Sequence, residues 1–409
     1  MQGKRILLGI TGSIACYKSI DLASKLTQAG AAVDVILTES AMKFIEPLSL
    51  SSVTGRPAYW DMWGLEDHIL HVKLAESADL IIIAPATAHT IAKLAHGLAD
   101  NLLTVSILAA RTSLILAPAM DAGMYKHPAT SENISILRKR GVIFAGPTVG
   151  RMASGMTGPG RMLEVADLLD HIRHALSKSG SLKGNKIVVT AGPTEEPIDP
   201  IRFLTNRSSG RQGFALAQAA LDAGAEVTLI SGPAAQKIPF GLELIRVRTA
   251  VEMHEAVLNA IKDCDVLLMA AAVSDFRPED IQKEKMKKDG LKGSGLSLNL
   301  VRNPDILADV RKLGQESGER PTVVLGFAAE TTDIMVHGEK KLVQKGLDFI
   351  VINDVSAPGS GFATDTNKVV ILGLDGRKWD LPLQEKSQVA EKVISIVSEE
   401  LLKKNKAAD

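Results

Sequence analysis

The segment from Lys186 to Gly213 constrains the fold of this chain more than any other; it reads KIVVTAGPTEEPIDPIRFLTNRSSGRQG. An apolar run at 187–189 leads into a loop rich in Gly, Pro and Asp. Ser208-Ser209-Gly210 then stands directly before the helical pattern GFALAQAALDAG. This is the order of a strand, a long loop and a helix N-terminus, where free backbone N–H groups and the helix dipole attract an anion. The segment therefore predicts a nucleotide-type α/β domain.

The beginning of the chain repeats this order in a shorter form. Residues 4–10 are strand-like, Thr11-Gly12-Ser13 is a tight turn, and residues 14–30 have helical periodicity. A chain of 409 residues is also too long for a single core, so two domains of about 180 to 220 residues are expected. The Ser-, Gly- and Lys-rich segment 174–186 predicts the linker, with a boundary near Gly180. We therefore expect domains at 1–180 and 181–409.

Short apolar runs alternate with helical patterns in both halves. The runs are rich in Ile, Leu and Val and too short for helices, which is typical of buried parallel strands. The first half has predicted strands at 5–10, 33–37, 80–84 and 114–117, and predicted helices at 14–29, 87–96, 100–110 and 130–140. The second half has predicted strands near 187–190, 226–230, 265–270, 322–326 and 348–352, and a last helix at 384–403 before a frayed tail. The predicted fold class is α/β, with two doubly wound, mostly parallel-sheet domains in tandem.

Composition narrows the class of protein. The 47 basic and 47 acidic residues balance, so no bulk field favours nucleic acid or an anionic membrane. The two cysteines, Cys16 and Cys264, fall in opposite halves and cannot make a disulfide framework, which favours a reducing cytoplasm. The N-terminal apolar run is too short for a signal peptide, and no stretch reaches the length of a membrane span. We expect a cytoplasmic protein without nucleic-acid or membrane partners.

Small hydroxyl residues follow three predicted strands of the first half. Gly12-Ser13-Ile14 follows the first strand, Thr38 the second and Thr87-Ala88-His89-Thr90 the third. A Gly-Ser turn alone is common in any α/β protein, and only Gly9 and Gly12 are present of the three-glycine dinucleotide fingerprint. Three such strand ends at one edge of an open sheet nevertheless predict a ligand site there.

Ten motifs, dispersed in one order over nearly the whole chain, carry a resemblance to known families. GITGSIACYK, APATAHTIAKLAHGLADNLL, APAMDAGMY and GPGRM resemble the flavin-dependent cysteine decarboxylases. TAGPTEEPIDPIRFLTNRSSGRQG, AAVSDFRP, KEKMKK, NPDI, GFAAET and the Lys-rich helix before FIVINDV resemble phosphopantothenate–cysteine ligases. Fused in this order, they resemble the bacterial bifunctional phosphopantothenoylcysteine decarboxylase/phosphopantothenate–cysteine ligase family of coenzyme A biosynthesis.

For the first half, the resemblance implies FMN at the sheet edge, with its phosphate on the Gly-Ser turn and its ring near the Pro-Ala-Met segment. Flavin supplies the electron sink that a cysteine carboxylate lacks, because it oxidises the thiol to a thioaldehyde before CO2 leaves. His71 matches the family's active-site base, and imidazole suits thiol proton transfer near neutral pH. Without that context, a lone His would be a half-exposed helix residue. The implied FMN-binding positions are Gly12, Ser13, Ile14, Thr38, Thr87, Ala88, His89, Thr90 and Ala119.

Two residues depart from the family pattern. Asp121 stands where the family has an Asn that contacts the substrate carboxylate, and Ser154 where it has a Cys in a mobile lid that protonates the enethiolate. An ionised Asp121 would repel a carboxylate unless that like charge raises its pKa. A serine hydroxyl is a far poorer proton donor than a thiol, whose ordinary pKa is about 8.5. These two substitutions therefore bear most on the last step, the reduction of the enethiol. Cys16 is better interpreted as a packing residue than as a substitute donor.

For the second half, joining 4′-phosphopantothenate to cysteine requires an acyl-nucleotidyl intermediate, and a triphosphate needs cations and backbone donors. The resemblance implies that Lys285, in the basic loop 283–292, is the flexible catalytic lysine and that Asn206 handles the intermediate. Such a basic run is otherwise typical of a solvated loop. Bacterial relatives use CTP with Mg2+ on its phosphates; the sequence assigns no metal ligand. The implied CTP positions are Asp275, Lys285, Asn303, Pro304, Asp305, Ile306, Phe327, Lys341 and Lys345.

Three functions compete at this point. The first is the bifunctional enzyme, acting on 4′-phosphopantothenate, cysteine and CTP. The second is an active ligase fused to an FMN-binding domain that has lost decarboxylation, which Asp121 and Ser154 support. The third is a tandem Rossmann oxidoreductase, which the missing fingerprint disfavours. We prefer the first because His71 and the lid frame GPGRM are retained. The family's trimeric flavin domains and dimeric ligase domains also imply a homo-oligomer.

Overall fold

A computed structural model describes residues 1–63, 69–286, 297–330, 334–354, 361 and 364–408. The chain forms two compact units, Met1–Leu176 and Ser177–Asp409. The division between them lies within the Ser- and Gly-rich segment 174–186.

The first unit is built on six parallel strands in the order β3-β2-β1-β4-β5-β6. The four predicted strands are confirmed, and β4 is buried along its whole length, as its unbroken apolar run requires. The order reverses between β1 and β4, and the crevice at such a reversal is where open α/β sheets bind ligands. The strands are β1 (Arg5–Ile10), β2 (Ala32–Leu37), β3 (Ala58–Tyr59), β4 (Leu80–Ala86), β5 (Ser113–Pro118) and β6 (Ile143–Phe144).

Helices cover both faces of this sheet, so the predicted doubly wound fold is confirmed. One core includes side chains of α1, α2 and α8, and the other includes side chains of α3, α4, α5 and α7. The helices are η1 (Ile14–Cys16), α1 (Tyr17–Gln28), η2 (Ala41–Lys43), α2 (Pro47–Thr54), α3 (Leu70–Ser77), α4 (Ala88–His96), α5 (Leu102–Ala109), α6 (Ala122–Lys126), α7 (Pro128–Lys139) and α8 (Val165–Ser177). An antiparallel hairpin, β7 (Thr148–Arg151) and β8 (Thr157–Arg161), precedes α8.

The second unit repeats the same central order in an eight-stranded sheet, β13-β12-β9-β14-β17-β18-β19-β20. Its first six strands are parallel, and β19 and β20 extend it as an antiparallel hairpin. The strands are β9 (Lys186–Ala191), β12 (Glu226–Ser231), β13 (Glu243–Arg246), β14 (Val266–Met269), β17 (Val323–Glu330), β18 (Phe349–Asp354), β19 (Thr366–Gly373) and β20 (Lys378–Glu385). Five of the six parallel strands were predicted; β13, β19 and β20 were not. β20 is mostly exposed and carries no continuous apolar run.

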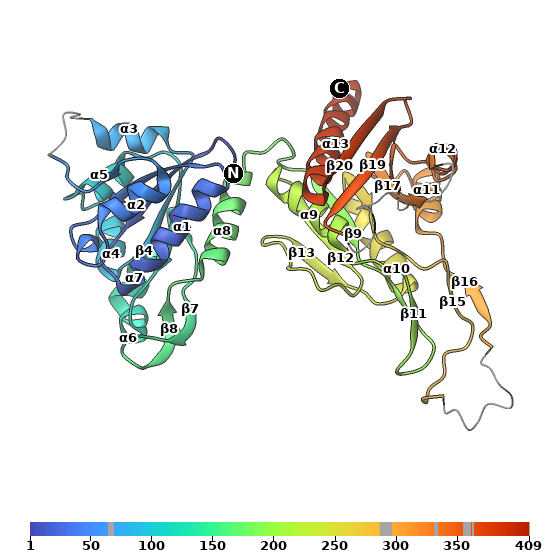
Figure 1. Ribbon diagram of the computed structural model, residues 1–409, viewed down its shortest axis with the longest axis horizontal. Coiled ribbons are helices and arrows are strands. Elements are labelled where there is room, and N and C mark those ends of the chain that lie inside the picture. Colours follow the sequence, from blue (N-terminus) through green and yellow to red (C-terminus); the bar gives the residue numbers. More distant parts are fainter. Residues whose placement is uncertain (64–68, 287–296, 331–333, 355–360, 362–363, 409) are drawn as a thin grey trace. The chain divides into compact units, whose positions relative to one another are not determined.

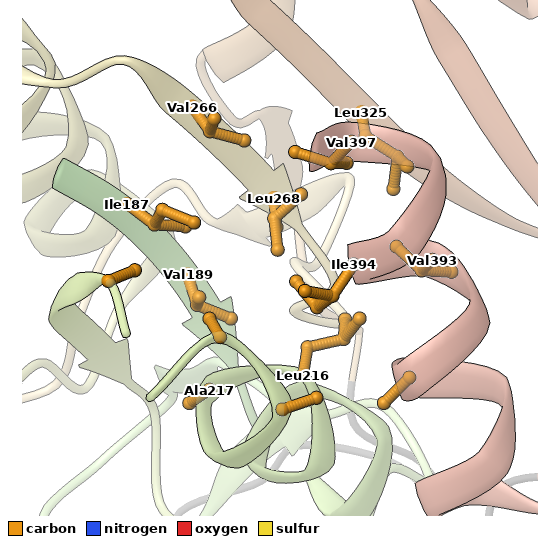
Figure 2. Close-up of a cluster of buried hydrophobic side chains, with 14 of the residues drawn as sticks. Ile187, Val189, Leu216, Ala217, Val266, Leu268, Leu325, Val393, Ile394 and Val397 are labelled. Carbon is orange, nitrogen blue, oxygen red and sulfur yellow. The ribbon is translucent and has the colours of Figure 1, made fainter. Parts of the chain in front are cut away.

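Helices α9 and α13 pack on one face of this sheet, as Figure 2 shows for Leu216, Val393 and Ile394 against Leu268. Helices α10, α11 and α12 contribute to the core on the other face. The helices are α9 (Arg211–Asp222), α10 (Ala250–Ala260), η3 (Ile261–Asp263), α11 (Ile306–Ser317), α12 (Ile334–Gln344) and α13 (Lys386–Ala408). Among the described residues, no helix combines the length and apolar character needed to cross a membrane.

Two short antiparallel ribbons follow the carboxyl ends of β9 and β14. Figure 1 shows β11, β15 and β16 extending away from the main sheet of this unit. The ribbons are β10 (Glu195–Pro197) with β11 (Phe203–Thr205), and β15 (Phe276–Pro278) with β16 (Leu300–Arg302). They carry the segments in which Asn206 and Lys285 were predicted to act.

The frayed C-terminal tail predicted after residue 403 is wrong, because α13 continues to Ala408. Its last turns are attached to the sheet: the Lys404 ammonium donates to Asp348 Oδ1 and to the Thr322 carbonyl, both at 2.7 Å. The basic composition of the tail gave no sign of these contacts, since they depend on residues more than 50 positions earlier.

We predict that Leu268→Ala destabilises the second unit by about 2–5 kcal/mol, because Leu268 on β14 is fully buried under α9 and α13. Urea unfolding followed by the fluorescence of Trp379, which packs against the same core, measures the change. Leu383→Ala is the matched control, since half-exposed Leu383 lies on β20 and its truncation costs at most about 0.5 kcal/mol. Equal losses in the two variants would contradict the core assignment.

Candidate functional sites

A cleft of about 1000 Å³ opens at the carboxyl edge of the first sheet. It is lined by the segments that follow β1, β2, β4 and β5 and by the β7–β8 hairpin. The structure brings together in this cleft all the FMN positions predicted from the sequence, which are Gly12, Ser13, Ile14, Thr38, Thr87, Ala88, His89, Thr90 and Ala119. Asp121 and Ser154 line it as well.

The turn after β1 forms one wall of the cleft. A Cβ atom on Gly12 would lie 2.5 Å from Ser40 Cβ, so the turn after β1 approaches the turn after β2 more closely than any other residue allows. Ser13 is extended and caps the helical segment that follows, its Oγ accepting from Ala15 N at 3.3 Å. The N–H groups of Ala15 and Cys16 both donate to Ser13, so an anion would be favoured here by the dipole of the helical segment and by the N–H groups of the preceding turn.

A buried threonine joins the two central strand ends. Thr11 Oγ1 donates to the Pro85 carbonyl at 2.7 Å and accepts from Thr87 N at 3.1 Å, so it bridges β1 and β4. Thr87 in turn caps α4, its Oγ1 accepting from Thr90 N. Sequence analysis missed Thr11, although its position beside Gly12 at a strand end was a usable signal.

The hairpin β7–β8 lies against the turn between β5 and α6. Met120 N donates to the Gly160 carbonyl at 3.0 Å, and a Cβ on Gly160 would lie 2.2 Å from the Met120 carbonyl oxygen. At the hairpin tip, the Ser154 hydroxyl donates to Asp121 Oδ2 at 2.6 Å. The two residues that depart from the family pattern are therefore in direct contact.

Hydrogen bonding keeps the Asp121 carboxylate charged. Its pKa is held below the ordinary value, first by the Ser154 hydroxyl and then by the Gly123 N–H, which donates to Oδ1 at 2.9 Å. The carboxylate is therefore ionised at neutral pH in the ligand-free chain. A substrate carboxylate placed beside it would meet a like charge.

Charged side chains that the sequence analysis did not single out also line the cleft. Lys18 is buried and donates to Glu164 at 2.9 Å and to the Met162 carbonyl at 3.2 Å. Lys93 forms an ion pair with Asp100 at 2.6 Å, which lowers the pKa of Asp100. The remaining charged lining residues are Glu39, Arg151 and Arg161. For Lys93 the sequence did hold a signal: it lies four residues after His89 on α4, so both side chains are on the same face of the helix.

Two candidates from the first half lie outside the cleft lining. His71 is half-buried in the first turn of α3, a helix that packs on α5 and does not contribute to the cleft. Cys16 is fully buried; its thiol donates to the Thr11 carbonyl at 3.2 Å, and burial raises its pKa. Cys16 is thus a packing residue that stays protonated at neutral pH.

In the second unit, the predicted residues Asn206, Asp275 and Asn303 lie just beyond the carboxyl end of β14. The Asn206 amide donates to the carbonyls of Ala272 and Val273 at 3.1 and 3.2 Å. Buried Thr194, which the sequence analysis missed, accepts from Ser274 N at 3.0 Å. Gly210, at φ +75°, begins α9 so near Gly192 that an added Cβ would lie 3.3 Å from the Gly192 backbone.

The start of α11 forms the next part of this edge. The Asn303 amide donates to the Ser274 carbonyl at 2.8 Å, and Asp305 caps α11 by accepting from Ala308 N at 3.1 Å. Lys345 makes an ion pair with Asp305. Of the other predicted CTP positions, Pro304 directly precedes Asp305, Phe327 is half-buried in β17, and Lys341 is exposed on α12. Asp275 and Lys285 are also exposed, and Ile306 is buried in the core. Ile306 therefore has only its backbone to offer a ligand.

The part of the basic loop from residue 287 to 292 lies outside the described residues. Among the residues that the structure describes, no three His, Cys, Asp or Glu side chains are arranged to hold a metal ion.

We predict that Ser154→Ala raises the pKa of Asp121 towards its ordinary value, because the hydroxyl is the largest cause of the lowered pKa. A lowered pKa means that the bond between the charged Asp121 and Ser154 is kept at neutral pH and lost as pH falls through the folded-state value. Carboxyl-carbon chemical shifts of the Asp-labelled protein measure this titration. Ser52→Ala removes a hydroxyl that donates to the Leu48 carbonyl within α2 and is the control. An unchanged Asp121 pKa in Ser154→Ala would contradict the contact.

Two family profiles divide the chain at nearly the same place as the two compact units. The flavoprotein family profile matches residues 1–177, and the profile of the DNA/pantothenate metabolism flavoprotein C-terminal domain matches residues 182–401. Among solved structures, the C-terminal domain of a coenzyme A biosynthesis bifunctional protein CoaBC is 36% identical, with a TM-score of 0.46 over 55% of this chain and 100% of that one. A mutant PPC decarboxylase complexed with pantothenoylaminoethenethiol is 34% identical, with a TM-score of 0.38 over 42% of this chain and 96% of that one.

Full-length relatives are more similar. The chain is 45% identical over 404 residues to the coenzyme A biosynthesis bifunctional protein CoaBC of Bacillus subtilis (strain 168), covering 97% of each chain. It is 40% identical over 408 residues to the protein of that name in Escherichia coli (strain K12), covering 99% of each. The resemblance that the motifs indicated is thereby confirmed: the chain belongs to the family of bifunctional enzymes of coenzyme A biosynthesis known as CoaBC.

Proposed function

We propose that residues 1–180 form an FMN-dependent decarboxylase that converts 4′-phosphopantothenoylcysteine to 4′-phosphopantetheine. We propose that residues 181–409 form the ligase that makes this substrate from 4′-phosphopantothenate, cysteine and CTP. The observation that supports the first assignment best is the cleft itself, in which the FMN positions predicted from separate segments line one cavity of about 1000 Å³. A cavity of this volume is large enough for a flavin nucleotide together with part of a substrate.

The residues of the cleft fit FMN. The turn before the helical segment, with the dipole of that segment, suits its phosphate, and Gly12 leaves no Cβ to obstruct the approach. The hydroxyl groups of Thr38, Thr87 and Thr90 are the kind of polar group that fixes the orientation of a ligand. Bound there, flavin would supply the two-electron sink that decarboxylation needs. The polypeptide would supply binding, orientation and proton transfer.

Asp121 would govern how the substrate carboxylate binds. Since Asp121 is ionised in the free cleft, bringing in a second carboxylate raises the pKa of Asp121, and the pair binds with uptake of one proton. Arg151 and Arg161 line the same cleft and would offset part of this repulsion. His71 lies outside the lining of this cleft, so in this proposal it takes the thiol proton in the cleft of a second copy of the chain. The exposed apolar side chains of Ile14 and Tyr17 at the cleft support the self-association that the family implies.

We predict that the full-length protein loaded with FMN releases CO2 from 4′-phosphopantothenoylcysteine. Proton uptake on binding makes kcat/KM fall about tenfold per pH unit above the pKa of free Asp121. Asp121→Asn removes this slope, because a neutral amide can donate a hydrogen bond to the substrate carboxylate without taking up a proton. Rates of CO2 release measured across the neutral pH range test both parts.

The result that would overturn the decarboxylase proposal is a protein that binds FMN and releases no CO2. The first half would then be a flavin-binding domain that has lost its activity. His71→Asn should abolish CO2 release with FMN still bound; full activity in that variant would remove His71 from the site.

For the second unit we propose two steps. A carboxylate oxygen of 4′-phosphopantothenate attacks the α-phosphorus of CTP and pyrophosphate leaves; the cysteine amine then attacks the acyl carbon and CMP leaves. Lys285, exposed beyond β15, would supply the cation for the triphosphate in the first step. Asn206, held against the end of β14, would bind an acyl oxygen in the second step without adding charge. Mg2+ would be carried chiefly by the nucleotide phosphates, an arrangement that needs no protein cluster.

We predict that Lys285→Gln lowers acyl-cytidylate formation by at least about 100-fold, because a cation on a transferring phosphoryl group is worth several kcal/mol. Asn206→Asp should instead slow the second step, so that the acyl-cytidylate accumulates. Mass spectrometry of the quenched reaction distinguishes the two variants. Wild-type ligation rates in both would show that neither residue acts as proposed.

A further inference from the structure

The tight turn between β10 and β11 is organised around one buried carboxylate. Asp199 Oδ1 accepts from the N–H groups of Ile201 and Arg202, both at 2.8 Å, and the Asp199 side chain is fully buried. Backbone bonds between Ile198 and Arg202 close the same turn. A buried charge is costly unless all its oxygens are bonded, so the second oxygen also requires partners.

The second oxygen reaches a segment 87 residues further along the chain. Asp199 Oδ2 accepts from Met286 N at 3.3 Å and lies 3.4 Å from the Arg202 guanidinium. That guanidinium donates to the Met286 carbonyl at 3.3 Å. The turn therefore binds both backbone groups of Met286, one through a carboxylate and the other through a guanidinium.

A second attachment holds the same segment on the other side of Lys285. Gln282 N donates to the Ile198 carbonyl at 2.9 Å, so the turn binds the chain both before and directly after the lysine. Lys285 itself is exposed, and its side chain is not part of these contacts. The pKa of Asp199 is held below its ordinary value, first by the Ile201 N–H, so the bonds from Asp199 are charge-assisted and stronger than neutral ones.

We propose that Asp199 is a positioning residue for Lys285: through Met286 it fixes the backbone from which the lysine reaches the nucleotide. The inference rests on the function proposed above for Lys285. The backbone bonds of the turn use Oδ1, which accepts from Ile201 and Arg202. Oδ2 meets the Arg202 guanidinium within the turn, and its bond from Met286 N is the contact that joins the carboxylate to the lysine segment.

Asp199→Asn separates these two roles in the full-length protein. The amide oxygen still accepts from Ile201 and Arg202, but the amide NH2 now faces the Met286 N–H, so two donors oppose each other. The single-turnover rate of pyrophosphate release from CTP and 4′-phosphopantothenate, measured without cysteine, should fall by about 10- to 100-fold, the scale expected for a misplaced catalytic group, with little change in the CTP concentration that gives the half-maximal rate. Hydrogen exchange at the Met286 amide should become faster.

Two further variants distinguish a positioning role from a structural one. In the Lys285→Gln background, Asp199→Asn should cause no additional loss, because it acts through the lysine. Asp375→Asn is the matched control: Asp375 binds Arg377 N in the β19–β20 hairpin, and its variant should keep the wild-type rate. If Asp199→Asn does not fold, Asp199→Ser retains an acceptor for the turn but has no second oxygen for Met286.

The outcomes separate this inference from the proposed function. A wild-type rate in Asp199→Asn with an inactive Lys285→Gln overturns the inference and leaves the function of the lysine intact. A further loss in the double variant also overturns it, since Asp199 would then act independently of Lys285. A wild-type rate in Lys285→Gln overturns the proposed function of the lysine and this inference with it.

Discussion

Both sites depend on a buried threonine hydroxyl that joins the two strands between which the strand order reverses. In the first unit, Thr11 after β1 bonds to the backbone of Pro85 and Thr87 on the β4 side. In the second, Thr194 after β9 bonds to Ser274 N on the β14 side. Chains leaving these strands turn to opposite faces of the sheet, so a crevice opens between them. The side-chain bond helps to keep the walls of the crevice at a fixed separation; in the second unit it adds to the backbone bonds that Ala272 makes with Gly192 and Thr194.

Close backbone approach shapes the same two regions. Gly12 brings the turn after β1 against Ser40, and Gly210 brings the start of α9 against Gly192. At each place a Cβ would meet atoms at contact distance or nearer, so a side chain there would either push the elements apart or fill the ligand space. The glycines thus leave helix N-terminal N–H groups uncovered. The two units repeat this design with different sequences, which is why motif spacing alone indicated α/β folds but not their full chemistry.

The sequence predicted what is encoded locally. Apolar runs located most of the parallel strands but not β3, β6 and β13. Small residues at strand ends located the first cleft, because burial and turn geometry act over a few neighbouring residues. Contacts between distant positions were not predictable: Asp121 and Ser154 are 33 residues apart, and Asp199 and Met286 are 87 apart. The continuation of α13 to Ala408 was missed for the same reason, since Lys404 binds residues on the sheet.

Two carboxylates with lowered pKa values illustrate how exposure determines what such a group can do. Hydrogen-bond donors keep both Asp121 and Asp199 ionised. Asp199 is fully buried and both its oxygens are bonded, so its charge serves to hold the chain. Asp121 lies at the cleft, where its charge acts on whatever enters. A hydroxyl 2.6 Å from that exposed charge keeps the hairpin tip beside it. The pair that departs from the family pattern is thus a coupled polar contact at the cleft.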